Sequence, residues 1–222
     1  FGVGYDGVDV NACTESDVVL CITAGAVNRP VAEATVGWMI ALGHRMINKD
    51  QLVRKGLWYQ SSQYMGCELR DKVLGVVGLG GIGLSVIELL RGFGMKKTLV
   101  YDPFIDKNKA NELNVNKVEL DELMQQSDFI TVHCPLNEHT RDIISYRELD
   151  LMKSSSFIIN TARGGIINED ALYAALSKNH IAGAALDCFN NEPIIKPHKF
   201  GELENVMLAP HSIAWTQELF RD

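Results

Sequence analysis

The sequence predicts an α/β protein built on a doubly wound parallel sheet. Three observations carry this prediction. Short apolar runs alternate with amphipathic helical stretches along most of the 222 residues. One of these runs leads through a glycine-rich turn into an apolar helix, and several others end in clusters of polar residues. Such alternation is typical of βαβ units, whose parallel strands are covered by helices on both faces.

The elements follow one another at short intervals. We expect a first strand at residues 18–22 and a long amphipathic helix over residues 30–55, with Pro30 in its first turn. After a polar connection, the pattern predicts strands at residues 73–77, 98–101, 129–132, 157–160, 183–186 and 206–208. The predicted helices between them cover residues 81–93, 120–126, 147–152 and 169–177. Together these elements predict one doubly wound domain, preceded by a partial βα unit.

Composition narrows the class of protein. Hydrophobic residues make up 46% of the chain, yet no apolar run reaches the roughly 18 residues of a membrane span, and no signal peptide opens the sequence. The net charge of −7, without a basic cluster, argues against nucleic-acid and membrane partners. The five cysteines form no Cys-x-x-Cys pair, which is typical of reduced thiols. We therefore expect a cytoplasmic protein without a metal site.

A dinucleotide site is predicted at Gly78-Leu79-Gly80-Gly81-Ile82-Gly83, where a strand meets a helix. In this Rossmann fingerprint Gly78 permits the tight turn, Gly80 lets the backbone approach a pyrophosphate, and Gly83 lets the helix pack on the strand. The N–H groups at the helix start, near Gly81 and Ile82, face the phosphates. The alternative is a glycine turn that binds no ligand.

Asp102 ends the next predicted strand, nineteen residues after Gly83. A carboxylate at this position accepts hydrogen bonds from both ribose hydroxyls and repels a 2′-phosphate. No arginine follows in Pro103-Phe104-Ile105, so the sequence favours NAD over NADP as the cofactor.

Three candidate catalytic residues follow other strands. Arg163 comes after residues 157–160, Glu192 lies in the loop after residues 183–186, and His211 follows residues 206–208. Reduction of a 2-oxo acid by hydride needs a cation for the carboxylate, a proton donor active near neutral pH, and a carboxylate that holds this donor. Arginine, histidine and glutamate supply these groups. Each alone has a plain structural alternative: a surface arginine, a turn-capping histidine or a solvated glutamate.

Together these motifs resemble the NAD-dependent D-isomer-specific 2-hydroxyacid dehydrogenase family. The likeness runs from Phe1 to Asp222 and rests on three signatures: Gly78–Gly83, residues 127–140, and residues 152–164. The resemblance implies that Arg163 binds substrate, that Glu192 supports His211, and that His211 is the acid/base. It also implies further binding residues: Asp187 for the nicotinamide amide, Cys134, Pro135, Thr140, Thr161, Ala162 and Thr35 for the cofactor groove, and the backbone of Val3 and Gly4 for the substrate carboxylate.

The family resemblance also divides the chain. It implies that residues 1–28 are the last part of a flavodoxin-like substrate lobe, that residues 29–211 are the NAD-binding Rossmann domain, and that residues 212–222 begin a segment returning to the lobe. Because the sequence starts inside a glycine-rich turn and stops in a helical pattern, we expect a longer protein. The resemblance further suggests a homodimer formed through the long helix that starts near Pro30.

The sequence thus predicts an enzyme that interconverts a small 2-oxo acid and its D-2-hydroxy acid. Glyoxylate or hydroxypyruvate, lactate and 3-phosphoglycerate chemistry all remain open, since the discriminating contacts belong to the rest of the substrate lobe. Glu192 argues for hydroxyacid chemistry, because formate dehydrogenases of the family have glutamine in its place. Trp215 is expected either at the pocket mouth or in a packing role. The rival hypothesis is a non-enzymatic NAD-sensing scaffold, because corepressor relatives can retain all three catalytic residues.

Overall fold

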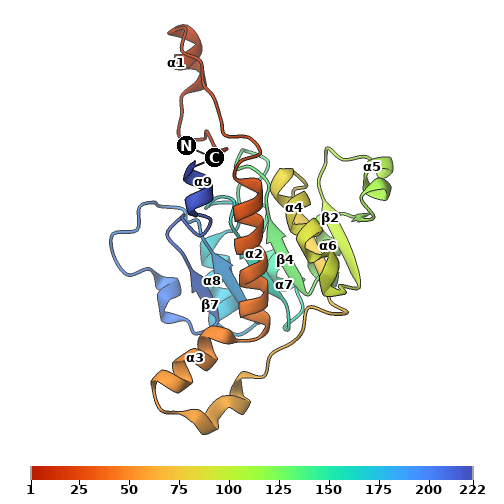
Figure 1. The fold of residues 1–222 in the computed structure, drawn as a ribbon, viewed down its shortest axis with the longest axis vertical. Helices are drawn as coiled ribbons and strands as arrows, with labels where there is room; N and C mark the ends of the chain where they lie inside the picture. Colours follow the sequence, from red (N-terminus) through yellow and green to blue (C-terminus); the bar gives the residue numbers. More distant parts are fainter. Residues whose placement is uncertain (1, 222) are drawn as a thin grey trace.

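A parallel sheet forms the centre of the computed structural model, which describes residues 2–221. Within that range the sheet has seven strands in the order β3-β2-β1-β4-β5-β6-β7 (Figure 1). Their bounds are β1 Val73–Val77, β2 Lys97–Tyr101, β3 Asn116–Lys117, β4 Phe129–Val132, β5 Phe157–Asn160, β6 Gly183–Leu186 and β7 Val206–Leu208. This order reverses direction between β1 and β4, as in doubly wound dinucleotide-binding folds, and it confirms the predicted fold class.

The carboxyl ends of the central strands lie level with one another. Val77 pairs with Val132, Val132 with Asn160, and Asn160 with Leu186. The residues that follow these strands therefore emerge side by side at one edge of the sheet. Every residue of β1, β4, β5 and β6 is buried, which explains their continuous apolar or small-residue sequences.

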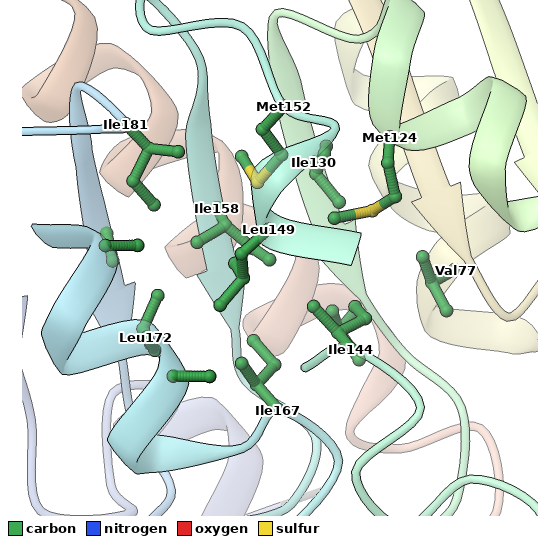
Figure 2. Packing of buried hydrophobic residues seen from close by; sticks show 14 of the residues in the cluster. Val77, Met124, Ile130, Ile144, Leu149, Met152, Ile158, Ile167, Leu172 and Ile181 are labelled. Carbon is green, nitrogen blue, oxygen red and sulfur yellow. The ribbon is translucent and has the colours of Figure 1, made fainter. Parts of the chain in front are cut away.

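Helices cover both faces of the sheet. On one face, α2 (Asn28–Gly43) packs on α4 (Gly81–Leu90), and α5 (Lys107–Glu112) adds Ala110 to the same buried cluster. The other face carries α6 (Leu120–Gln126), α7 (Tyr146–Asp150) and α8 (Glu169–Ser177). Figure 2 shows this second core, in which Met124 of α6 and Leu149 of α7 meet Ile130 and Ile158 of the strands. No helix within residues 2–221 is long and apolar enough to cross a membrane.

The predicted helix over residues 30–55 is two helices. After α2 ends at Gly43, Arg45 adopts a left-handed conformation with φ of 54°, and α3 runs separately over Met46–Arg54. The Arg45 guanidinium lies 5.1 Å from the centre of the Phe157 ring, and its Nη1 donates to the carbonyl oxygen of Ala182 at 3.0 Å. These tertiary contacts stabilise a break that helical periodicity does not reveal.

The strand predicted at residues 18–22 is also wrong. Within the described residues no strand pairs with this segment, and Val18 instead donates its N–H to Cys13, closing the turn after the short helix α1 (Val10–Glu15). Residues 18–22 are exposed, and α1 projects from the body of the molecule (Figure 1). An isolated apolar run has a strand-like sequence but lacks the partner that would make it a strand.

Several short elements were not predicted from the sequence. They are α1, α5, β3, and 3₁₀ helices at Trp58–Tyr64, Arg91–Phe93 and Lys199–Glu202. The helical pattern near the end of the sequence corresponds to α9 (Gln217–Arg221). The last three residues of the predicted helix over 81–93 form the 3₁₀ helix Arg91–Phe93, because α4 ends at Leu90. Residues 1 and 222, the outer limits of the predicted segments, lie outside the described range.

Candidate active site and nucleotide site

The glycine-rich loop after β1 is tight on one side and open on the other. Gly78 has φ of +90°, and a Cβ added to it would lie 2.6 Å from the backbone nitrogen of Cys134. A Cβ on Gly83 would lie 2.6 Å from the carbonyl oxygen of Gly78, whereas one on Gly80 would meet no atom within 4 Å. The open space at Gly80, beside the N-terminus of α4, fits a pyrophosphate group. The loop is therefore tight at Gly78 and Gly83 and open at Gly80, as the fingerprint predicts.

Asp102 lies where β2 ends and contacts the glycine-rich loop directly. Its Oδ2 accepts a hydrogen bond from the backbone N–H of Leu79 at 2.7 Å, and its Oδ1 accepts one from Phe104 at 2.8 Å. An ionised carboxylate has about four acceptor positions, so two remain for ribose hydroxyls. The structure therefore brings Asp102 to the loop, as its spacing from Gly83 predicts.

The segment after β4 forms another wall of this site. Cys134 lies against Gly78, and burial raises the pKa of its thiol to about 11. Thr140 closes the following turn, since its Oγ1 donates to the carbonyl oxygen of Pro135 at 2.6 Å and accepts from the N–H of Asn137. Cys134 is therefore a neutral packing group rather than a nucleophile.

Thr35 and Thr161 meet between α2 and the end of β5. The hydroxyl of Thr35, fully buried, donates to the carbonyl oxygen of Val31 at 2.8 Å and lies 3.3 Å from Oγ1 of Thr161. Both residues were predicted to line the cofactor groove, and they are 126 positions apart. This contact ties α2 to the turn that carries Arg163.

The turn after β5 is held by the buried side chain of Asn160. Its Oδ1 accepts from the N–H of Ala162 at 3.0 Å, and its Nδ2 donates to the carbonyl oxygen of Arg163 at 2.8 Å. A Cβ on Gly164 would lie 2.1 Å from the backbone of Phe189, so this turn packs closely on the loop after β6. The sequence analysis gave Asn160 no role, although its place at the last position of a buried apolar strand marks it as unusual.

Arg163 reaches the turn at the start of the chain. Its Nε donates to Oδ1 of Asp6 at 2.9 Å and its Nη1 to the carbonyl oxygen of Ala162 at 2.7 Å. Gly4 lies against the guanidinium, because a Cβ there would fall 1.2 Å from Nη2. Gly4 and Arg163, which were both predicted to bind the substrate carboxylate, therefore lie together. Val3 belongs to the same turn, and Asp6 is a contact that the sequence analysis missed.

Glu192 and His211 form a hydrogen-bonded pair. The distance between Nδ1 of His211 and Oε2 of Glu192 is 2.6 Å, and the other carboxylate oxygen accepts from the N–H of Phe189 at 2.7 Å. Nδ1 is thus engaged by a carboxylate that is itself fixed, which leaves Nε2 as the remaining ring nitrogen. This is the arrangement of a proton donor oriented by an acid.

Asp187 fixes the backbone around His211. Its Oδ1 accepts from the N–H groups of Ser212 at 3.0 Å and Ile213 at 3.2 Å, and its carbonyl oxygen accepts from the N–H of His211 at 2.8 Å. These bonds surround a histidine with φ of 54°, a conformation that few non-glycine residues adopt. Burial raises the pKa of Asp187, and the two N–H groups act in the opposite direction.

Cys188 shows that the charged residues of this edge lie close together. Burial raises the pKa of its thiol, Asp187 and Glu192 raise it further, and the charge of Arg163 lowers it. The Sγ atom of Cys188, a carboxylate oxygen of Glu192 and a ring nitrogen of His211 lie within 4.8 Å of one another. A metal ion could bind there only if the thiol lost its proton, because the thiolate is the form that binds metals. The present contacts favour a proton relay instead. Trp215 packs edge-on against Phe220, with 5.5 Å between the ring centres.

Comparisons with known proteins agree with this geometry. Residues 36–212 match the family described as "D-isomer specific 2-hydroxyacid dehydrogenase, NAD binding domain". The chain is 41% identical over 218 residues to a D-3-phosphoglycerate dehydrogenase of Methanocaldococcus jannaschii, covering 98% of this chain and 41% of that protein. It is 36% identical over 221 residues to a glyoxylate reductase of Korarchaeum cryptofilum, covering 98% of this chain and 66% of the relative.

Solved structures give the same result. A D-lactate dehydrogenase from Aquifex aeolicus, complexed with NAD and lactic acid, superposes with a TM-score of 0.89 at 31% identity, over 99% of this chain and 70% of that one. The chain therefore spans about two fifths of the phosphoglycerate dehydrogenases and about two thirds of the shorter relatives that it matches. The chain belongs to the D-isomer-specific 2-hydroxyacid dehydrogenase family, and it carries the NAD-binding domain of that family.

Proposed function

We propose that the protein interconverts small 2-oxo acids and D-2-hydroxy acids with NAD as the cofactor. The observation that carries this proposal is the 2.6 Å pair of His211 and Glu192 at the sheet edge where Arg163 also emerges. A cation, an oriented proton donor and a dinucleotide loop on one edge are the groups that this reduction needs.

In the direction of reduction, Arg163 binds the substrate carboxylate and polarises the adjacent carbonyl group. Bound NADH supplies the hydride to the carbonyl carbon. As negative charge grows on the carbonyl oxygen, His211 donates its Nε2 proton there, and Glu192 stabilises the positive ring before transfer. In the reverse direction, neutral His211 accepts the hydroxyl proton. Asp187 keeps His211 in place through the backbone.

The cofactor lies, in this proposal, along the carboxyl ends of β1, β2 and β4. The N–H groups from Gly80 to Gly83 bind the pyrophosphate, and Asp102 binds the ribose hydroxyls. Residues Cys134, Pro135, Thr140, Thr161, Ala162 and Thr35 line the groove, and the carboxylate of Asp187 is the proposed partner of the nicotinamide amide. Oδ2 of Asp187 is available to this amide, because among the described residues it accepts at most one long hydrogen bond, from the backbone N–H of Ile213 at 3.4 Å.

Relatives suggest the range of substrates. Those matched are named D-3-phosphoglycerate dehydrogenase, glyoxylate reductase and hydroxypyruvate reductase, and the structural neighbours include D-lactate dehydrogenases. All of these names imply a carboxylate next to the reacting carbon. We therefore propose that the substrate is a small 2-oxo acid, whose carboxylate contacts Arg163 and the backbone of Val3 and Gly4.

The proposed domain division keeps residues 29–211 as the NAD-binding domain. Residues before 29 and after 211 belong, in this proposal, to the substrate lobe and the segment returning to it. No residue of α1 is buried, and the helix projects from the body, which supports this assignment (Figure 1). We further propose that two copies pair through α3 and the following segment, because both expose large apolar side chains.

The direct test is a panel of 2-oxo acids incubated with NADH, followed by absorbance at 340 nm. We expect oxidation of NADH with at least one of glyoxylate, hydroxypyruvate, pyruvate or 3-phosphohydroxypyruvate. His211→Ala should lower kcat by about 10²- to 10⁴-fold, the usual contribution of general acid catalysis, while NADH binding measured by fluorescence is unchanged. Tight NADH binding with no turnover of any acid by the unaltered protein would favour the scaffold function instead.

A further inference from the structure

Asp6 is the only acidic partner that the described residues provide for the guanidinium of Arg163. The two residues are 157 positions apart, so their contact joins the glycine-rich turn near the start of the chain to the turn after β5. The side chain of Arg163 is 24% exposed and that of Asp6 48% exposed, which makes this a partly enclosed pair facing the site. Such a contact restricts a long side chain that otherwise has several rotamers.

The hydrogen bonds of Arg163 leave one part of the guanidinium free. Asp6 accepts from Nε and the carbonyl oxygen of Ala162 accepts from Nη1, whereas Nη2 donates to no described residue. Nη2 lies directly against Gly4, in the place that a side chain at that position would occupy. A guanidinium has five N–H donors, so three remain for a substrate carboxylate and carbonyl group.

The way in which Asp6 binds the guanidinium distinguishes between two possible roles for Asp6. A carboxylate that imitates the substrate would bind the guanidinium in two-point fashion, with both oxygens on two of its nitrogens. Asp6 instead uses a single oxygen on Nε. The guanidinium in turn lowers the pKa of Asp6, with a smaller contribution from the charge of His211, so Asp6 is ionised and close to both residues.

We propose that Asp6 is a positioning residue for Arg163: it holds Nε so that Nη2 is presented, over Gly4, to the carboxylate of the substrate. This inference rests on the proposed function and adds a residue for which no role was predicted. A side chain at position 4 would displace the Arg163 guanidinium from this place.

The kinetic test compares three variants of the protein. Asp6→Ala removes the acceptor, and we expect the KM for the 2-oxo acid to rise by about 10- to 100-fold, the cost of a misplaced binding group, with KM for NADH unchanged. Asp6→Asn keeps an acceptor oxygen and should stay within about threefold of the unaltered protein. Asp9→Ala is the matched control, because Asp9 lies in the same segment but only caps α1 through the N–H of Ala12.

Opposite results would overturn the proposal. If Asp6→Ala and Asp6→Asn both lower the KM for the 2-oxo acid, then Asp6 competes with substrate. If Asp6→Ala has no more effect than Asp9→Ala, then Asp6 has no role in binding.

A second measurement does not depend on turnover. The Nε–H signal of Arg163 in a ¹H–¹⁵N spectrum, assigned by its loss in Arg163→Lys, should be protected from exchange in the unaltered protein and in Asp6→Asn. It should be lost or broadened in Asp6→Ala. An unchanged signal in Asp6→Ala would disprove the contact itself. Failure of the proposed function would instead appear as absent turnover in every variant, with the Nε–H signal still dependent on Asp6.

Discussion

Single side chains determine the shape of the loops that carry the proposed chemistry. Asn160, Asp187 and Glu192 each accept backbone N–H groups within their own or a neighbouring loop, at 2.7 to 3.2 Å. Polar groups in a partly buried loop need such partners, because an unpaired group costs about 1 to 3 kcal/mol. The same residues therefore stabilise the loops and place Arg163 and His211.

His133 gives a prediction about stability at the residue scale. Its Nε2 lies 2.9 Å from Oγ1 of Thr131, its buried Nδ1 has no partner among the described residues, and burial lowers its pKa to about 3. In the unfolded chain a histidine takes up a proton near pH 6.5. As the pH falls from 6.5 towards 3, only the unfolded state gains this proton, so stability falls by up to about 1.4 kcal/mol per pH unit.

Urea unfolding from pH 7 to pH 4.5 measures this effect. We expect His133→Gln to lose less stability over that range than the unaltered protein. His139→Gln is the control, because the side chain of His139 is exposed and its ion pair among the described residues is with the neighbouring Glu138. Parallel pH profiles for all three proteins would show that His133 is protonated in the folded state.

At the scale of elements, the register of the sheet brings the site together. Gly78, His133, Thr161 and Asp187 each follow the last residue of a central strand, and the paired strands end at the same level. The apolar runs were sufficient to predict these strands, because strands buried on both faces are continuously apolar. The break at Arg45 and the two-residue strand β3 were not predictable, because each depends on distant partners: Phe157 and Ala182 for Arg45, and β2 for β3.

The turn after β2, where Asp102 contacts the glycine-rich loop, gives a prediction about cofactor choice. In Asp102→Ser combined with Pro103→Arg, the ribose acceptor is lost and a cation for a 2′-phosphate is introduced. We expect the ratio of kcat/KM for NADH to that for NADPH to fall by about 10- to 100-fold, equivalent to about 1.4 to 3 kcal/mol.

The single variant Asp102→Ser should lose activity with NADH without gaining activity with NADPH. Since Asp102 also binds the N–H of Leu79, thermal unfolding of each variant checks that the loop is intact. An unchanged preference for NADH in the double variant would contradict the role proposed for Asp102.

At the scale of the whole molecule, one end carries an apolar surface remote from the site. It consists of exposed side chains of α3 and the segment after it, at the end opposite to the chain termini (Figure 1): Met46, Ile47, Val53, Leu57, Trp58, Tyr59 and Met65. Adjacent large apolar side chains on a surface are typical of interfaces between proteins. Because the predicted long helix is two helices, we propose this surface, rather than a single long helix, as the contact between two copies.

Sedimentation velocity tests the proposed pairing. The unaltered protein should sediment with twice the mass of one chain. Trp58→Glu should weaken association by at least about 2 kcal/mol, or about 30-fold in Kd, because buried tryptophans dominate such interfaces. Ile195→Glu, which changes an even more exposed apolar residue elsewhere, should leave association unchanged. A single-chain mass for the unaltered protein at micromolar concentration would argue against pairing.

The candidate site was more predictable than its supporting contacts. Glycine spacing and strand-end position sufficed to identify Gly78–Gly83, Asp102, Arg163, Glu192 and His211 as candidates, because parallel strands bring their ends together. Asp6 and Asn160 were missed as contacts. Asp6 meets Arg163 only through the path of a loop, and Asn160 acts through its own backbone turn. Local sequence contains no signal for the contact of Asp6, which is 157 positions from Arg163, whereas the only signal for Asn160 was a polar residue at the end of a buried apolar strand.

The order of the strands has a consequence for how such a protein can change over time. The proposed contacts to the pyrophosphate and the ribose follow β1 and β2, whereas Arg163, Glu192 and His211 follow β5, β6 and β7, with β4 between the two groups. At about 4.8 Å per strand, Asp102 and Arg163 stand about 14 Å apart, beyond the distance at which the effects of substitutions usually couple. Cofactor preference and substrate choice are therefore separable traits, and selection or design can alter one while preserving the other.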